Sequence, residues 1–485
     1  MAGILLCASQ SMATSDLSYL QGLLSNTPAG GWVKASTTTY SSAWVPTNEM
    51  LVGTPAGIAR AWASVAWDSN SGNLLLWGGG HANYGGNEMY VWKGSDGAWT
   101  RGSLPSALSN VPQVINGVSD TRYFFVTDSA APQSSHPYDN NLFLPVNNMF
   151  MTFGGAAYNS GRGLETWNGS TAARAGPWLW DPTKADANKT GGIQGSIANP
   201  NTLGGQMWTN RIDSRTPDST APFGSLTNGT ADRFVNGTTA YRQEDGKDVV
   251  YVTEKARCSG CAGYRDLYRY EAGDVRNGGL DRYQWVGISD WNAPSTTGAA
   301  TIDSQRQLYV HTIAYPGSYP ADLGVWDLTQ SEAANPGANR NKPIQLIQAD
   351  GSAFVMTDKY GLDYDEASGM LVLWDNMQGG RVWVTSAEYD TDGSLKSSWT
   401  VLALEPSSLA FPAAPAATVG VLGRWKYINE LGAFIALNEF NSTTRDAEVW
   451  LYKPVVTVVP EAGTWAMLLA GLGVVLMRAR RHRAA

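Results

Sequence analysis

The segment Trp62–Arg101 reads WASVAWD-SNSGN-LLLWGGG-HANYGGNE-MYVW-KGSDG-AWTR. It alternates between apolar, strand-like runs and turns rich in glycine, serine and asparagine. Alternation with a period of two, and short apolar runs bounded by turn residues, are typical of β-strands. A sheet of four such short strands cannot bury both of its faces alone, so it needs neighbouring sheets. The segment therefore predicts one four-stranded antiparallel unit of a larger repeat array.

The same pattern recurs along the chain, in copies near Asn141, Thr238, Ala299, Gly361 and Gly423. Equivalent second-strand positions of the six copies lie 76, 99, 58, 63 and 63 residues apart, at Trp77, Phe153, Val252, Val310, Leu373 and Ala436. The last three intervals indicate a period near 60 residues. The interval of 99 residues leaves room for a degenerate copy around Trp178–Ile212, or else for a large loop insertion. At this period residues 31–453 would hold about seven units, so seven copies are favoured over six.

Radial stacking of four-stranded sheets buries both faces of every sheet. We therefore expect an all-β fold in which residues 31–453 form a β-propeller of four-stranded antiparallel blades, seven in number, with six as the alternative. The last copy shows only three clear strands, whereas the strand-like stretch Gly31–Ala35 precedes the first copy. We expect this N-terminal stretch to supply the missing strand and so to close the ring.

Two copies carry a further motif of paired glycines followed by aromatic residues. It consists of Leu76, Trp77, Gly78, Gly79, Gly80 and His81 with Asn87, Met89, Tyr90 and Trp99 in the first copy, and of Phe153, Gly154 and Gly155 with Trp167 and Trp178 in the second. The motif resembles that of the kelch-type propellers, including the propeller of the galactose oxidase group. This resemblance implies a fold, and fold alone does not give function.

The composition excludes several other classes of protein. The 485 residues are 43% hydrophobic and only 16% charged, with 53 Gly, 20 Trp and 21 Tyr. The apolar content is too high for a disordered chain, and charged residues are too scarce for a coiled coil. A net charge of −8 without a basic stripe argues against nucleic acid as a partner. A surface of Gly, Ser, Thr, Asn and aromatic residues indicates a protein outside the cytosol.

The N-terminus has the features of an export signal. Residues 1–13 contain a short apolar patch and then small residues that end in Ser11-Met12-Ala13. They predict a signal peptide, whose start would lie upstream of Met1 because the positive n-region is missing; an ordinary frayed N-terminus is the alternative. Cys258 and Cys261 would be the cysteines of the mature chain, and we expect a local disulfide between them rather than half of a zinc site.

The C-terminal residues 454–485 predict a tether followed by a second targeting signal. The signal consists of Pro460 and Glu461, an apolar run at 463–477 that predicts a hydrophobic helix, and the basic residues Arg478, Arg480 and Arg481. The helix is short for a bilayer span, which suits a transient stop-transfer segment. The tail resembles the PEP-CTERM sorting signal, although Ala462 replaces the second proline. The resemblance implies recognition by an exosortase and delivery to the cell surface or exopolysaccharide matrix of a Gram-negative bacterium; a plain membrane anchor is the alternative.

Loops at one end of the expected propeller gather the candidate site residues. The loops between second and third strands open on the same face as the loops that lead into the first strands. We expect a catalytic group there of His81, Tyr84, His136 and Arg424. We expect substrate contacts from Asn87, Tyr138, Tyr158, Arg162, Arg60 and Tyr264. Imidazole, phenol and guanidinium groups can supply the proton transfers and the positive charge that an acidic saccharide requires.

Three functions compete for this face. Recognition of carbohydrate, in particular of an acidic polysaccharide, needs only aromatic and hydrogen-bonding loops, and it is favoured because no catalytic motif is complete. A polysaccharide lyase would use His or Tyr as acid and base, with Arg neutralising the uronate. Copper-radical oxidation is disfavoured, because it needs a Tyr crosslinked to a Cys whereas Cys258 and Cys261 sit together. The residues indicate no particular cofactor, and a structural or catalytic metal stays open as an alternative.

Overall fold

The computed structural model describes residues 16–455 with gaps in several loops. The gaps are at 51, 82, 110–112, 116–117, 121–125, 159–163, 168–171, 175, 202–203, 217–233, 254–265, 290–296, 314–320, 331–337, 358, 416–418 and 440–445. The predicted targeting and disulfide elements lie outside the described residues: the signal peptide 1–13, the helix 463–477, Pro460, Glu461, Arg478, Arg480, Arg481, Cys258 and Cys261. No helix within the described ranges is long and apolar enough to cross a membrane.

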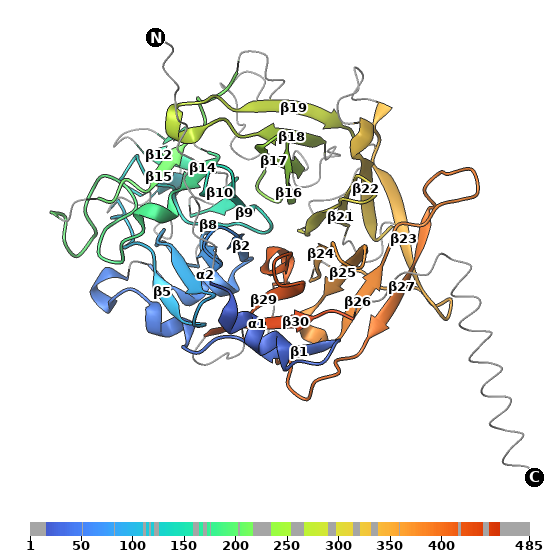
Figure 1. Cartoon of the computed structure of the whole chain (residues 1–485). Helices are drawn as coiled ribbons and strands as arrows, with labels where there is room; N and C mark the ends of the chain where they lie inside the picture. The colour runs from blue at the N-terminus through green and yellow to red at the C-terminus, as the bar shows by residue number, and fades with distance from the viewer. Residues whose placement is uncertain are drawn as a thin grey trace, which may run out of the picture.

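The described strands form six blades of four antiparallel strands around a central axis (Figure 1). The outermost strands of blades four and five also pair with each other in parallel, so these two blades form one eight-stranded sheet. The strands of each blade are named from the axis outwards. Blade one consists of β2 (Ser64–Asp68), β3 (Asn73–Trp77), β4 (Tyr90–Lys93) and β5 (Trp99–Arg101), and blade two of β9 (Asn141–Leu144), β10 (Met149–Thr152), β14 (Trp178–Trp180) and β15 (Trp208–Asn210). Blade three consists of β16 (Thr239–Glu244), β17 (Lys247–Thr253), β18 (Leu267–Glu271) and β19 (Arg282–Gly287). Blade four consists of β20 (Ala300–Asp303), β21 (Leu308–Thr312), β22 (Leu323–Asp327) and β23 (Lys342–Gln348), and blade five of β24 (Gly361–Asp365), β25 (Met370–Trp374), β26 (Val382–Thr385) and β27 (Ser398–Leu404). Blade six consists of β28 (Trp425–Ile428), β29 (Ala433–Glu439), β30 (Ala447–Lys453) and β1 (Gly31–Lys34).

The remaining elements are short and lie outside the blades. They are helices α1 (Ser18–Ser25) and α2 (Ala56–Arg60) and the strand pairs β6 (Gln113–Ile115) with β7 (Val118–Asp120), β8 (Ser135–His136) with β11 (Ala156–Ala157), and β12 (Glu165–Trp167) with β13 (Ala172–Arg174). The innermost strands β2, β9, β16, β20, β24 and β28 contact one another in sequence, and β28 contacts β2 in turn. The fold is therefore an all-β propeller.

The expectation of seven blades is not confirmed, because six blades account for all the described blade strands. The region from Trp178 to Ile212 does not form a blade of its own. Strand β14 pairs with β10 in the register Phe150↔Trp180, and β15 pairs with β14. The interval of 99 residues therefore reflects long connections within and after the second blade, which was the alternative explanation.

The expected closure by the N-terminus is confirmed. Strand β1 pairs antiparallel with β30 in the register Gly31↔Lys453, and the two ends of the colour range lie side by side in Figure 1. The side chain of Trp32 is buried, and its ring lies 5.1 Å from that of Trp374 in blade five and 5.1 Å from that of Tyr452 in blade six. The closing strand therefore packs against both blades that meet at this point.

A buried ion pair crosses the central axis. The Lys426 ammonium of β28 donates to the Asp139 carboxylate at 3.0 Å. The other oxygen of Asp139 accepts the backbone N–H of Thr239 at 3.2 Å and that of Ala300 at 2.9 Å. Burial lowers the pKa of Lys426, but the charges of Asp139 and Asp363 outweigh this effect and the pKa is raised. One carboxylate thus ties together blades two, three, four and six.

Candidate functional site

The loops at one end of the ring bring together five side chains, Trp62, His81, Asn83, His136 and Tyr138, which we call the His81 site. Trp62 precedes β2, His81 and Asn83 follow β3, and His136 and Tyr138 precede β9. The His81 and His136 rings meet edge to face with centroids 5.8 Å apart, and the His136 ring lies 4.7 Å from the Trp62 ring. The backbone N–H of Tyr138 donates to the carbonyl of Trp62 at 2.9 Å. The loop topology was therefore a correct guide to the proximity of His81, His136 and Tyr138.

Two glycines allow the strand that carries His136 to pass between blades one and two. A Cβ atom on Gly80 would lie 2.3 Å from the Cα of Ser135, and one on Gly155 would lie 1.7 Å from the carbonyl oxygen of His136. Neither position can hold a side chain without moving this backbone. The paired glycines of the sequence motif are therefore required because β8 lies directly against them.

The backbone at this end of the ring is strained. Trp62, His81, Tyr138 and Leu422 have φ values of +48°, +42°, +55° and +50°, a region that side-chain-bearing residues rarely adopt. Each such residue costs about 1 to 3 kcal/mol, and strain of this kind concentrates at functional sites. The strained residues come from loops of blades one, two and six, so tertiary contacts hold them in place.

The His136 imidazole is held as a neutral group. Its Nε2 lies 2.7 Å from the amide nitrogen of Asn83, which can only donate, so Nε2 is the acceptor and Nδ1 carries the proton. Burial and the neighbouring His81 lower the pKa of His136 to about 3, against the opposing effect of a hydrogen bond to the Gly80 backbone. His136 thus positions Asn83 and His81 and stays uncharged at neutral pH.

An apolar cluster closes the channel beside the His81 site. Tyr138, Ala156, Val235 and Leu422 are buried together, and the partly exposed Trp62 packs against them. Burial raises the pKa of Tyr138 to about 12, so its phenol remains protonated over the physiological range.

Two expected site residues, Tyr84 and Asn87, have buried structural contacts instead. The Tyr84 hydroxyl donates to the Glu88 carboxylate at 2.7 Å, and burial raises the pKa of Tyr84 well above its usual value. The Asn87 amide donates to the carbonyl of Pro132 at 2.8 Å and accepts the Ser106 N–H at 2.8 Å. The candidate site does not include Tyr84 and Asn87, because the side chains of both residues face the interior.

The guanidinium of Arg424 is also buried, contrary to the expected role in catalysis. It is 2% exposed and donates to the backbone carbonyls of Ala59, Val421 and Gly420, which joins the loops of blades one and six. Burial lowers its pKa to about 10, so it stays charged. A guanidinium enclosed by carbonyl groups cannot reach a ligand.

The other expected contact residues have different placements. Tyr158 is 1% exposed, and its backbone N–H donates to Ser134 at 2.9 Å. Arg60 is partly exposed two positions before Trp62, with its Nε 3.6 Å from the Glu439 carboxylate. Arg162 and Tyr264 lie outside the described residues. In the described part of the chain no group of three or more side chains could hold a metal ion.

The neutral state of His136 predicts a pH-dependent stability. An unfolded histidine has a pKa near 6.5, whereas that of His136 is about 3, so the unfolded chain binds the extra proton between these values. The contribution of the neutral His136 to the free energy of unfolding is fully present above about pH 6.5 and is lost as the pH falls. Lowering the pH from 7.5 to 5 should therefore reduce the free energy of unfolding by roughly 2 kcal/mol. Denaturant titration at the two pH values measures this loss. The variant His136→Gln should lack this part of the pH dependence; equal pH slopes for both proteins would contradict the assignment.

Sequence reasoning missed Trp62 and Asn83. Trp62 occupies the loop into β2, just as Tyr138 occupies the loop into β9, so a closer alignment of these two loops could have identified it. Asn83 had no distinguishing signal, because its role depends on the His136 ring, 53 positions away.

Comparisons with known proteins give the following results. A scan against models of protein families finds no match, and a comparison with curated proteins finds none. Among solved structures, an α-L-arabinanase of Penicillium chrysogenum complexed with arabinobiose has a TM-score of 0.36 and 12% identity, over 86% of this chain and 98% of its own. A chain of the mitotic checkpoint complex has a TM-score of 0.30 and 9% identity, over 84% and 94%.

A third solved structure, the subtype N11 neuraminidase-like protein of A/flat-faced bat/Peru/033/2010, has a TM-score of 0.25 and 10% identity, over 81% of this chain and 98% of its own. At TM-scores this low the similarities carry no argument about function. The fold assignment rests on the strand order of the chain itself.

Proposed function

We propose that this protein recognises carbohydrate, and specifically an acidic polysaccharide, at the His81 site. The carrying observation is that strained backbone places the partly exposed residues Trp62 and His81 around the ring of His136, which contacts both of their rings. An aromatic face stacks on the C–H face of a sugar ring, and an imidazole donates or accepts a hydrogen bond with its hydroxyls. Arg162, from the sequence, would supply positive charge for a uronate carboxylate, whereas the Arg60 guanidinium already lies against Glu439.

The proposal includes the setting of the protein. The fold would be a kelch-type propeller, supported by the glycines at 78–80 and 154–155, of which Gly80 and Gly155 lie against β8. Export by the N-terminal signal and sorting by an exosortase would bring it to the cell surface or the exopolysaccharide matrix. An acidic matrix polysaccharide is the ligand that such a location offers.

A second candidate function is a polysaccharide lyase, and the state of His136 favours it. A neutral, fixed imidazole against His81 keeps that ring in place without adding a positive charge. His81 could then take the proton α to a uronate carboxylate as the bond from C4 to the leaving oxygen breaks, with that oxygen protonated by a second group. Tyr84, Tyr138 and Tyr158 are buried, so the described residues do not offer an exposed phenol for that step.

Replacing His81 tests the site directly. We expect His81→Asn to weaken binding of alginate, polygalacturonate or hyaluronan by about 1 to 3 kcal/mol, the range for a hydrogen bond to a polar or charged group. Asparagine is the suitable replacement, because it tolerates the positive φ of +42° better than alanine does. Isothermal titration calorimetry measures the affinity. The control is Gln305→Ala, a change in an exposed turn on the far side of the ring. Unchanged affinity in His81→Asn would contradict the proposal.

Product analysis separates binding from catalysis. If the protein is a lyase, incubation with the same polysaccharides will produce unsaturated ends that absorb in the ultraviolet, and His81→Asn will abolish their formation. Binding without such absorbance supports recognition alone.

Deletion of residues 459–485 tests the proposed sorting. The expected result is loss of surface delivery, because the apolar run and the arginines after it are the proposed exosortase signal. Cell fractionation measures the location, and a variant with only Arg478, Arg480 and Arg481 replaced by glutamine separates a sorting signal from a simple anchor. Unchanged delivery of the deletion variant would exclude the sorting function.

A further inference from the structure

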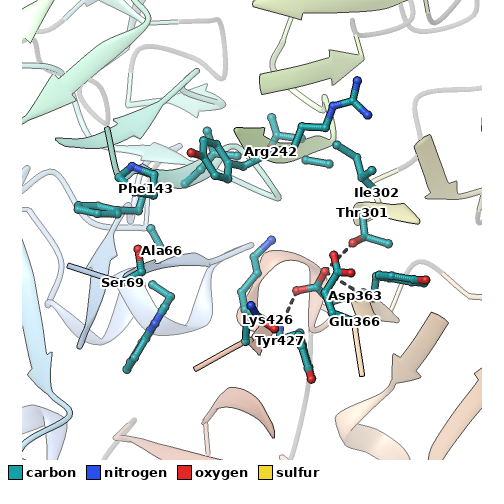
Figure 2. A pocket seen from close by; sticks show the side chains of 18 of the residues that line it. Ala66, Ser69, Phe143, Arg242, Thr301, Ile302, Asp363, Glu366, Lys426 and Tyr427 are labelled. Atoms are coloured by element: carbon teal, nitrogen blue, oxygen red, sulfur yellow. Dashed lines mark hydrogen bonds between the residues drawn. The ribbon is translucent and has the colours of Figure 1, made fainter. Parts of the chain in front are cut away.

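A pocket occupies the central channel at the end of the ring opposite to the His81 site (Figure 2). Its volume is about 690 Å³, within the range of small-molecule sites. The ends of all six innermost strands line it, with one large side chain from each blade: Trp67, Phe143, Tyr241, Ile302, Tyr364 and Tyr427. The turns that follow these strands form its mouth, whereas the His81 site lies on loops that precede them. The pocket is therefore a separate feature of the fold.

The inner part of the pocket offers both donors and acceptors. Lys426 points into the hollow in Figure 2, and its ammonium retains donor capacity beyond the bond to Asp139. The Asp363 carboxylate accepts the Thr301 hydroxyl at 2.6 Å and the backbone N–H groups of Tyr364 and Tyr427, which leaves one acceptor position on Oδ2. The Asn141 amide donates to two backbone carbonyls and is buried in the wall, so it holds the floor of the pocket in place. A ligand that fits these groups both donates and accepts hydrogen bonds, as hydroxyl groups do.

The walls of the pocket are aromatic. Trp67, Tyr241 and Tyr427 line it and are partly exposed, and they come from three different blades. Flat aromatic surface beside a few fixed polar groups is typical of sites that bind rings with one apolar face. This combination fits a sugar ring better than a purely apolar molecule.

The charge of the lining excludes an acidic ligand. Asp363, Glu366 and Glu430 carry three negative charges, and Arg242 and Lys426 carry two positive charges. Both cations are already engaged, because Arg242 bonds to Glu244 and Gln307, and Lys426 to Asp139. A ligand carboxylate would meet the carboxylates of Glu366 and Glu430 and would be repelled.

We propose that the channel pocket is a second carbohydrate site, which binds one uncharged sugar unit and is independent of the His81 site. The Asp139–Lys426 pair and the apolar cluster around Tyr138 and Leu422 separate the two sites along the axis. The protein would thus contact a neutral saccharide at one end of the ring while the His81 site meets its own ligand at the other.

Blocking the mouth of the pocket tests its role. Ser69 lines the mouth of the pocket in the partly exposed turn after β2. The Asp68 carboxylate holds this turn by accepting the backbone N–H groups of Asn70 and Ser71, so the turn does not depend on the Ser69 side chain. Saturation-transfer NMR with cellobiose, maltose and xylobiose at millimolar concentration should detect binding to the wild-type protein. Ser69→Trp should weaken that binding about tenfold or more. Gln305→Trp, the same bulky change in an exposed turn of the same face that does not line the pocket, should leave it unchanged.

Two results would overturn the proposal: no binding of any of these neutral disaccharides, or equal binding in the wild-type protein and Ser69→Trp. The His81→Asn variant distinguishes the two sites, since it should retain neutral disaccharide binding whatever it does to acidic polysaccharides. Loss of neutral binding in His81→Asn would mean that the channel is not an independent site.

The charge argument has its own test. A digalacturonate should bind the channel more weakly than the neutral disaccharides. The double variant Glu366→Gln/Glu430→Gln should raise the affinity for digalacturonate several-fold relative to that for the neutral disaccharides. Tighter binding of digalacturonate than of the neutral disaccharides to the wild-type protein, lost in Ser69→Trp, would overturn the assignment to an uncharged sugar.

Discussion

Replacing Trp32 by alanine should lower the free energy of unfolding by about 3 to 5 kcal/mol, the usual cost of removing a buried aromatic side chain. The indole is 2% exposed and donates to the carbonyl of Gly380 at 2.8 Å. Its ring lies 5.1 Å from that of Trp374 and 5.5 Å from that of Trp425. The change removes contacts to two blades and leaves a cavity where the ring closes.

Denaturant unfolding measures this loss, and Trp285→Ala is the matched control. Trp285 has the same side chain on the outermost strand of blade three but is 37% exposed. Its replacement should cost much less. Equal losses of unfolding free energy in the two variants would contradict the role of Trp32 in closing the ring, because they would show that its contacts with blades five and six add no stability beyond that of an ordinary surface tryptophan.

Replacing Asp139 by asparagine should cost about 3 to 5 kcal/mol, because the largely buried Lys426 ammonium loses the carboxylate to which it bonds. Asparagine has nearly the same shape, so the loss reports charge rather than volume. Asp139 is inaccessible to solvent, and its carboxylate also accepts two backbone N–H groups from other blades. The exposed Asp350→Asn is the control and should leave stability nearly unchanged.

A double-mutant cycle shows whether the two charges act as a pair. The variant Asp139→Asn/Lys426→Met should lose less stability than the sum of the two single variants, because neither charge is then left alone. Additive losses would contradict an energetic coupling across the axis.

The repeat of alternating strands was sufficient to predict the propeller, because strand alternation and turn residues are local properties of the sequence. The strand at Gly31–Ala35 likewise predicted the closure, since a lone strand needs a partner and the last copy lacked one. The number of blades was not predictable in this way. Strands β14 and β15 belong to blade two because Trp180 pairs with Phe150 and Trp208 pairs with Trp180. Spacing alone cannot distinguish a third strand after a long loop from a new blade.

The candidate site was predicted in part. Loop topology placed His81, His136 and Tyr138 at one end of the ring, as the structure has them. It could not show that Arg424 is enclosed by backbone carbonyls, because the partners of Arg424 come from blades one and six. Residue type indicates what a side chain can do, and only its neighbours determine whether it reaches a ligand.

The sequence by itself determined the all-β repeat, the turn chemistry and the glycines that bring two blades into contact. The tertiary structure alone decided which side chains meet: the neutral His136 against His81, and Lys426 between Asp139 and Asp363 across the axis. The physical reason is that strands and turns follow from contacts between near neighbours in the chain. Burial, pKa shifts and pockets instead depend on residues hundreds of positions apart, such as Asp139 and Lys426, which ring closure brings to one point.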